Sequence, residues 1–343
     1  MKKMIFTSLM LLVAAVGTQA KSWKIGPSSV TGMDFASINA AVGSSDVSAG
    51  DTLYLDQYYN ENAEQTVTKR VVIIGTGYDT SLTDEQVVAT LTSILNIKDD
   101  GVSVKSVRLA HVYLFNEDCV IERCQTDDIK ALSSLTGLNH VYSCYVNGIV
   151  CGYDNEHYSQ FDIQNCVLVC NGGSTLYFLT ESIIKNNVIS RWEGYWNQRY
   201  CLENVKNSEI VNNIILNYDD RYHDCDLHDN VIASGSGNVI EHNILSRTSA
   251  LTHYPTNMTG YGGSMSQLFT QQGNFSNYYE LANKSAAKGY ATDGGEVGCH
   301  GGMFGCPSGG RPQYIPYFSK VVVGSRTENG KLPVSVTIKI QDE

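Results

Sequence analysis

Positive charge is scarce in this chain of 343 residues, and so is proline. Lysine and arginine total 24 against 35 acidic residues, which gives a formal net charge of −11 at neutral pH. A protein this acidic repels nucleic acid and anionic membranes, so neither is an expected partner. Only six prolines occur, and no low-complexity run or linker interrupts the chain. We therefore expect one continuous folded body after the N-terminal segment.

Cysteine spacing typical of a zinc site is also missing. The ten cysteines form no paired CxxC motifs and no His/Cys pattern of that kind. Cys124, Cys144 and Cys166 recur at one repeated position, and three cysteines in one row cannot all pair within it. Buried free thiols and a disulfide framework both stay open for this row. Cys299 and Cys306 flank a glycine-rich loop, and for this pair we predict a disulfide.

The apolar run at the N-terminus is too short to span a bilayer. Residues 1–20 read MKKMIFTSLMLLVAAVGTQA and combine two lysines, the apolar run and a small-x-small ending. This pattern is typical of a secretory signal peptide cleaved before Lys21. The residue directly after the cleavage point is lysine and not cysteine, so lipid anchoring is not indicated. We expect a secreted, periplasmic or cell-surface protein without membrane insertion.

One short phrase recurs through residues 119–245: an aliphatic residue, two variable positions, and then cysteine or asparagine. Its Cys/Asn positions are Cys124, Cys144, Cys166, Asn187, Asn213, Asn230 and Asn243. A spacing of roughly twenty residues between β-rich phrases predicts a stacked solenoid. Buried asparagines can stack in such a fold by hydrogen bonding along the row, so we assign them a structural role. The shorter gaps around Asn230 leave open a different strand of an enlarged coil or a distorted turn.

Helical spacing precedes the repeats, at Phe35, Ile38, Ala41 and Val42, with Asp34 placed as N-cap. A short helix here would cover the open end of the stack. Strands are predicted at residues 50–55 and 70–75. Near the C-terminus, KVVVG and LPVSVTIKI alternate around a turn at residues 328–330. They predict a hairpin that packs on the last coil.

The order of these segments resembles the pectin-lyase-like superfamily of secreted right-handed parallel β-helix proteins. GDTLYL, TVTKRVVIIGTGYD and GVSVKSVRL are similar to its first coils, and residues 278–302 (YYELANKSAAKGYATDGGEVGCHGG) are similar to its closing coil. The resemblance implies an all-β, single-stranded right-handed parallel β-helix with an N-terminal helical cap and a C-terminal β-hairpin. We assign residues 1–20 to the signal peptide, 21–310 to the β-helix and 311–343 to the hairpin cap, and we expect a monomer.

Functional groups of such solenoids lie on an outer face and in the turns. Lyases of the superfamily that this chain resembles combine carboxylates that hold calcium with an arginine or lysine base. Residues 219–226 are the densest candidate, with four acids, an arginine and a histidine, although a solvated polar turn is the alternative. The candidates are Asp219, Asp220 and Asp224 as calcium ligands, and Arg221, Arg199 and His223 as catalytic groups.

Aromatic residues in the turn after Asn187 form a second candidate surface. They are Trp192, Tyr195, Trp196 and Tyr200. Aromatic faces stack on sugar rings, and the alternative is a cluster that packs the turn against the next coil. The two long turns follow Asn187 and Asn213 on successive coils, so they would be neighbours on one face. This favours a carbohydrate site.

Two classes of function follow from these features. In the first, the protein acts on or binds a polysaccharide or surface glycan. If it is an enzyme, we favour a uronate-polysaccharide lyase over a glycoside hydrolase, because the NTDG and GHG phrases of hydrolases with this fold are missing. Calcium is the one cofactor suggested. In the second class, the chain is a non-catalytic cell-surface or adhesion-type β-helix protein.

Overall fold

The computed structural model describes most of the chain after residue 19. The described residues are 20–80, 87–133, 135–152, 158–171, 175–192, 201–217, 237–245, 256–257, 268–270, 279–306, 310, 317–323 and 334–339. No helix in these ranges is long and apolar enough to cross a membrane.

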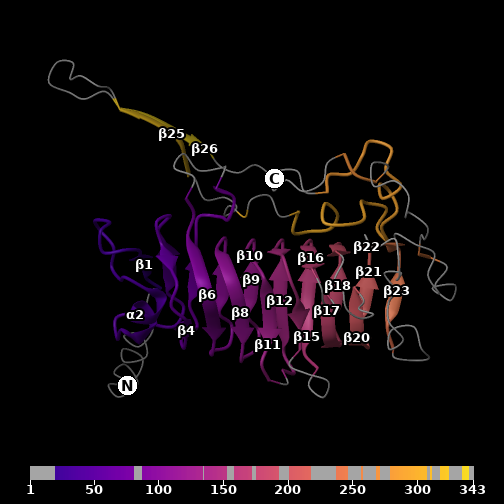
Figure 1. Ribbon diagram of the computed structural model, residues 1–343, viewed down its shortest axis with the longest axis horizontal. Coiled ribbons are helices and arrows are strands. Elements are labelled where there is room, and N and C mark those ends of the chain that lie inside the picture. Colours follow the sequence, from indigo (N-terminus) through magenta and orange to yellow (C-terminus); the bar gives the residue numbers. More distant parts are fainter. Residues whose placement is uncertain are drawn as a thin grey trace, which may run out of the picture.

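Two stacks of parallel strands dominate this part of the chain (Figure 1). Sheet A contains, in spatial order, β1 (Ser22–Ile25), β2 (Thr52–Leu55), β5 (Val72–Ile74), β7 (Ser103–Lys105), β9 (Val120–Glu122), β12 (Leu138–Tyr142), β15 (Gln160–Gln164), β18 (Ile183–Lys185), β21 (Glu209–Val211) and β23 (Val239–Glu241). Each strand pairs in parallel with the equivalent strand of the next coil. This is the stacking expected of a β-solenoid.

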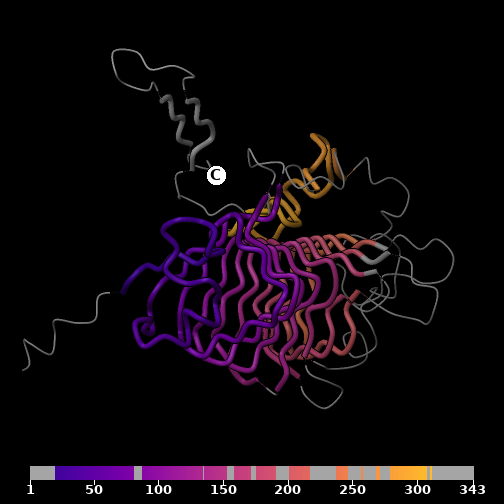
Figure 2. Tube along the Cα trace, turned by 60° about the vertical axis from the view of Figure 1, so that its left-hand side comes forward, coloured from indigo at the N-terminus to yellow at the C-terminus, as the bar shows by residue number. Residues whose placement is uncertain are grey.

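Sheet B is built in the same way from the strands that follow in each coil. They are β3 (Asn60–Glu61), β4 (Gln65–Val67), β6 (Thr90–Ile97), β8 (Arg108–Leu114), β10 (Gln125–Thr126), β11 (Asp128–Ala131), β13 (Tyr145–Val146), β14 (Val150–Cys151), β16 (Val167–Asn171), β17 (Leu176–Thr180), β19 (Val188–Trp192), β20 (Leu202–Lys206), β22 (Ile214–Asn217) and β24 (Ile244–Leu245). Strand β8 pairs with both β10 and β11, so the sheet continues as two rows of strands. Together the sheets curl into a half-barrel, consistent with the predicted parallel β-helix (Figure 2).

The core lies between the two sheets and follows from side-chain alternation along each short strand. One position that is in register through successive sheet A strands is aliphatic and at most 3% exposed. These residues include Val104, Ile121, Val141, Ile163, Ile184, Ile210 and Ile240. Valine and isoleucine pack well on themselves in a parallel stack, because their branched side chains fit the pleated surface. The residues on either side of them face outward, and this fixes which side chains can form a surface site.

The Cys/Asn position of the repeat forms a continuous buried row. The amide of each member donates to the side chain one coil further on: Cys144 to Cys166 Sγ (3.4 Å), Cys166 to Asn187 Oδ1 (2.9 Å), Asn187 to Asn213 Oδ1 (3.0 Å) and Asn213 to Asn243 Oδ1 (2.9 Å). The structural role predicted for these asparagines is therefore confirmed. Asn213 and Asn243 are consecutive in the row, and Asn230 lies outside the described residues.

The cysteines of the row are free thiols. Cys124, Cys144 and Cys166 are completely buried and none forms a disulfide. Their sulfurs donate to backbone carbonyls of the same coil and of the preceding coil, as Cys144 does to Tyr142 and Ile121. Of the two alternatives left open by the sequence, buried thiols are correct for this row.

The residue before each row member turns the chain from sheet A into sheet B. It has a positive φ in Arg123, Ser143, Asn165, Asn186, Asn212 and His242, and so has Ser106, the residue equivalent to Arg123 one coil earlier. This left-handed conformation is costly for most side chains, and asparagine tolerates it best after glycine. The seven residues form a row of tight turns along the outside of the stack, which we call the turn row.

The predicted N-terminal helix is present as α2 (Ile38–Gly43), but its N-cap is Ser37 rather than Asp34. Ser37 has extended backbone angles, and its Oγ accepts a hydrogen bond from the amide of Ala40 at 3.1 Å. Asp34 instead accepts from the amide of Lys24. The prediction was wrong because Phe35 joins the strand region through a bridge with Ile25 and not the helix. Asn39 then links α2 to residues 64–66 by three hydrogen bonds.

The segment predicted as a closing coil does not add a coil of parallel strands to the stack. Its described part, residues 279–302, takes part only in isolated antiparallel bridges and, with residues 303–306, lies along the outside of the stack (Figure 2). Its apolar side chains cover the outward row of sheet B formed by Val167, Val188, Ile214 and Ile244. A further coil would have left this apolar row exposed to water.

The C-terminal hairpin is confirmed as a local structure. Strands β25 (Tyr317–Val323) and β26 (Val334–Lys339) pair in an antiparallel ladder. The predicted turn at residues 328–330 lies outside the described residues. The hairpin's role as a cap stays a prediction.

Candidate functional site

Most of the site residues predicted from the sequence lie outside the described residues. These are Arg199, Arg221 and His223, the aromatic residues Tyr195, Trp196 and Tyr200, and the proposed calcium ligands Asp219, Asp220 and Asp224. Trp192 ends β19, where its backbone pairs with Asn171 of β16. Both predicted surfaces therefore remain predictions.

The described residues bring together a polar cluster that the sequence analysis missed. It lies on the outer face of sheet A and consists of His140 and Tyr142 from β12 with Asp162 and Gln164 from β15. Strand register places His140 beside Asp162 and Tyr142 beside Gln164. We call these four residues the outer-face cluster. Its members alternate with inward valine and isoleucine, so the pleat of the sheet is what points them outward.

Hydrogen bonds join the cluster around the carboxylate of Asp162. Tyr142 Oη donates to Asp162 Oδ2 at 2.5 Å, and Gln164 Nε2 donates to Asp162 Oδ1 at 2.7 Å. Tyr142 Oη also lies 2.7 Å from Nδ1 of His140, which is 3.5 Å from Asp162 Oδ2. A hydroxyl has one proton, so Tyr142 accepts here and His140 donates from Nδ1. The Nε2 nitrogen is then the ring atom that this network does not use.

Burial and hydrogen bonding set the charges of the cluster. Asp162 is 6% exposed, and burial alone would raise the pKa of its carboxyl group. Hydrogen bonds from His140, Tyr142 and Gln164 outweigh burial and hold that pKa below its ordinary value. Burial, together with donation to the Asp162 carboxylate, raises the pKa of Tyr142. The cluster therefore contains an ionised carboxylate and a neutral phenol around one imidazole.

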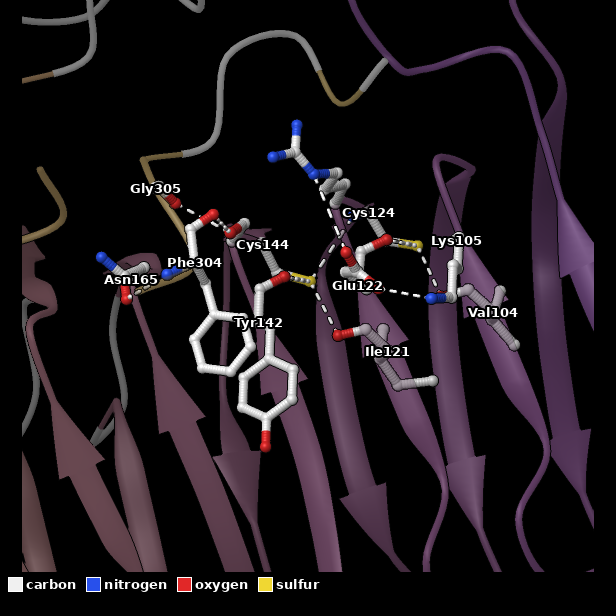
Figure 3. A network of polar contacts seen from close by, with 12 residues as sticks. Val104, Lys105, Ile121, Glu122, Cys124, Tyr142, Cys144, Asn165, Phe304 and Gly305 are labelled. Carbon is white, nitrogen blue, oxygen red and sulfur yellow. Dashed lines mark hydrogen bonds and ion pairs between the residues drawn. The ribbon is translucent and has the colours of Figure 1, made fainter. Parts of the chain in front are cut away.

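Charged residues on the neighbouring strands flank the cluster along the stack. On one side Lys105 binds Glu122 at 2.7 Å, and Arg123 Nε lies 3.8 Å from the other oxygen of Glu122 (Figure 3). On the other side Lys185 binds Glu209 at 2.5 Å. Both signs of charge are thus present beside the cluster.

An aromatic ring from the distant C-terminal segment packs on the cluster. Phe304 stacks on Tyr142 with ring centroids 3.9 Å apart and an interplanar angle of 7° (Figure 3). The hydroxyl of Ser143, the turn-row residue after Tyr142, donates to the carbonyl of Phe304 at 2.8 Å. No pattern in the sequence connects these two parts of the chain.

A second histidine–aspartate pair lies on the outside of sheet B. His111 Nδ1 is 3.2 Å from Asp128 Oδ2, and Lys130 Nζ is also 3.2 Å from that oxygen. Here the carboxylate is shared with a partly exposed lysine, and no aromatic hydroxyl bridges the pair. This group has the character of a surface ion pair, and it supplies a matched comparison for His140.

One group of possible metal ligands occurs among the described residues. Donor atoms of Cys299, His300 and Cys306 lie within 4.8 Å of one another. The two sulfurs form a disulfide, as predicted, so they are not available as thiolate ligands. The predicted calcium ligands are not among the residues described.

The signal that would have located the outer-face cluster is an offset within the repeat. His140 and Asp162 both stand four residues before a row member, Cys144 and Cys166. Aligning the repeats on the Cys/Asn position would have placed the two side chains next to each other on one face.

Known proteins give no independent guide to the chemistry of this site. No family model matches the chain, and no curated protein or solved structure shows significant similarity to it. The fold and the site define a parallel-strand solenoid with an acid–base cluster on one outer face.

Proposed function

We propose that this protein is an exported, right-handed parallel β-helix of the pectin-lyase-like kind, capped by α2 and by the C-terminal hairpin, that binds and cleaves a polysaccharide at the outer-face cluster. The observation that carries the proposal is the hydrogen-bonded chain from His140 through Tyr142 to the buried carboxylate of Asp162. A base held by an orienting group is the arrangement that general acid–base catalysis requires.

In this proposal His140 is the proton acceptor. Its Nδ1 proton is fixed by Tyr142, so the Nε2 lone pair faces away from the network and towards a bound sugar. When Nε2 takes up a proton, the negative charge of Asp162 stabilises the imidazolium. Tyr142 and Gln164 position the carboxylate, and they keep it ionised despite its burial.

The reaction class that fits a single base of this kind is β-elimination from a uronate. The carbon beside the uronate carboxylate loses its proton to His140 Nε2, and a carbon–carbon double bond forms. The glycosidic carbon–oxygen bond breaks, its electron pair stays on the leaving oxygen, and that oxygen takes a proton from the imidazolium. Lys185 stands beside Gln164 in the register of β15 and β18 and is partly exposed, and it would attract the acidic polymer.

Two features favour a polymer over a small ligand. Sheet A is a long, regular surface, and neighbouring strands in a sheet are spaced by about 4.8 Å, similar to the repeat of an extended sugar chain. Charged side chains continue on both sides of the cluster from β7 to β21. Trp192, Tyr195, Trp196 and Tyr200 are proposed as further sugar contacts, with calcium at Asp219, Asp220 and Asp224 and with Arg199, Arg221 and His223 beside it.

A non-catalytic surface or adhesion role is the second candidate. It is favoured by the hydrogen bonding of Asp162, because each of its two carboxylate oxygens already accepts a hydrogen bond, one from Tyr142 and one from Gln164. Such a network can also serve only to hold a binding face rigid.

The test compares the native protein with His140→Ala on a panel of polysaccharides. Cleavage is read both from the absorbance of unsaturated uronates and from new reducing ends, with and without a chelator. We expect elimination by the native protein and a loss of about 10²–10⁴-fold in His140→Ala. His111→Ala, which removes the matched histidine on sheet B, should keep the activity.

Equal activity in His140→Ala would show that the cluster is not catalytic. Cleavage that produces reducing ends without unsaturated products would replace elimination by hydrolysis. If no substrate is cleaved and glycans are still bound, the adhesion role is correct.

A further inference from the structure

The C-terminal segment is fastened to the turn row at several coils. We call residues 291–306 the strap. Asn212 binds Thr292 twice, accepting from its amide at 3.0 Å and donating to its hydroxyl at 3.1 Å. Asn165 Nδ2 donates to the carbonyl of Cys299 at 2.9 Å. The strap therefore crosses successive coils towards the outer-face cluster and is not a loose tail.

Hydrogen bonds from the turn row hold Phe304 of the strap next to Tyr142. The amide of Phe304 donates to Asn165 Oδ1 at 3.4 Å, and the hydroxyl of Ser143 shares its one proton between the carbonyls of Phe304 (2.8 Å) and Gly305 (2.7 Å). Both hydrogen-bonding groups of its backbone are thus held by the turn row. The ring can then lie face to face with Tyr142.

The disulfide between Cys299 and Cys306 closes the loop that carries Phe304. Gly302 and Gly305 both have φ of 73°, a conformation in which the loop can double back. Three glycines in a short loop would give many conformations if its ends were separate, and a crosslink removes most of them. Met303 is 89% exposed, whereas its neighbour Phe304 is turned onto the sheet.

Tyr142 needs such support because it is the central residue of the network. Its hydroxyl must reach both His140 and Asp162, and the residue is only half-buried even with Phe304 in place. A stacked ring restricts rotation of the tyrosine and excludes water from the short hydrogen bond to Asp162.

We propose that Phe304 is a positioning residue for Tyr142 and that the Cys299–Cys306 disulfide makes this positioning depend on the redox state of the loop. This inference rests on the function proposed above. Reduction by a dithiol breaks the one sulfur–sulfur bond and yields two thiols, while the dithiol becomes a disulfide. The loop ends are then separate, and Phe304 leaves Tyr142 more often.

The first test replaces Phe304 in the full-length protein. Phe304→Ala should lower kcat at least tenfold with little change in KM, and Phe304→Tyr should restore it. In the same variant Tyr142 should titrate at lower pH than in the native protein, because burial is the main cause of its raised pKa. That titration is read by NMR of carbon-labelled tyrosine, with Tyr142→Phe identifying the signal. Met303→Ala, one residue away and exposed, is the matched control and should change neither quantity.

The second test opens the loop. Dithiothreitol, or the double change Cys299→Ser with Cys306→Ser, should reproduce both effects of Phe304→Ala. Reduction of Phe304→Ala should add nothing further. The inference is overturned if Phe304→Ala or the opened loop leaves kcat and the Tyr142 titration unchanged. Because the titration needs no substrate, it still decides the positioning role if no polysaccharide is cleaved and the proposed function fails.

Discussion

The amide of Cys166 donates to the side-chain oxygen of Asn187 at 2.9 Å, and at this contact the thiol part of the buried row meets its amide part. Cys166 Sγ donates to the carbonyl of Val141 in the preceding coil, and Asn187 Nδ2 donates to the equivalent carbonyl of Ile163. Two chemically different side chains therefore satisfy the same backbone groups. An amide is the stronger donor and acceptor, because thiols form only weak hydrogen bonds.

This difference predicts unequal costs of truncation along the row. Asn213→Ala would leave the amide of Asn187 and the carbonyl of Ile184 buried without a partner. We expect it to lower the free energy of unfolding by roughly 3 kcal/mol or more, since each orphaned group costs about 1–3 kcal/mol. Cys144→Ala, the matched change in the thiol part, should cost about 1 kcal/mol. Urea unfolding of both variants measures the difference, and equal costs would contradict the ranking.

Burial also predicts how the thiols react. It raises the pKa of Cys119 to about 11 and of Cys151 to about 12, and it raises those of the row members Cys124 and Cys144 well above the ordinary thiol value. Thiolates, the reactive form, are therefore rare at neutral pH.

A thiol reagent at neutral pH should leave these cysteines unmodified in the native protein. After unfolding without reductant it should count seven thiols in a Cys225→Ser variant, which removes the cysteine that lies outside the described residues. Rapid reaction before unfolding would show that the row opens.

The low pKa of Asp162 predicts that the folded protein loses stability in acid. Its pKa in the folded protein is below the ordinary value of 3.8, so the unfolded chain binds the proton more readily. The stabilisation is complete above about pH 4 and is lost as the pH falls through the folded-state pKa. Asp162→Asn should therefore flatten the dependence of unfolding free energy on pH below 4. Asp51→Asn should act in the same direction, because hydrogen bonds also hold the pKa of Asp51 low against its burial. A slope unchanged in Asp162→Asn would contradict the assigned charge.

The last observed member of the row is Asn257. Its Oδ1 accepts from the amide and the side chain of Asn243, both at 3.0 Å, and its Nδ2 donates to the carbonyl of Ile240. Asn257→Ala should speed hydrogen exchange of the Asn243 amide while leaving that of Cys144 unchanged, because coils in a stack interact mainly with their neighbours. Thr256→Ala is the control, since the exposed Thr256 contributes its carbonyl and not its side chain. Equal exchange of Asn243 in both variants would show that Asn257 does not close the row.

The solenoid could be predicted from the sequence because its determinants repeat. Each copy carries an inward aliphatic residue and a Cys/Asn residue at a fixed offset, and parallel stacking brings equal positions together. The hairpin and the Cys299–Cys306 disulfide do not repeat. They could be predicted because the residues that form each of them are close together in the chain. The N-cap was misplaced because Asp34 and Ser37 are both good capping residues, and only the bridge of Phe35 to Ile25 decides between them.

What the sequence determined by itself is thus the period, the buried row and the outward alternation that makes His140 and Asp162 surface residues. The tertiary structure alone decided where the C-terminal segment lies. Phe304 meets Tyr142 because an apolar outward row on sheet B and the polar turn row together hold the strap along the stack. Such contacts join residues that are distant in the chain and follow no period, so no local pattern encodes them. The short-range repeat fixes the scaffold, and the long-range packing of the strap completes the site.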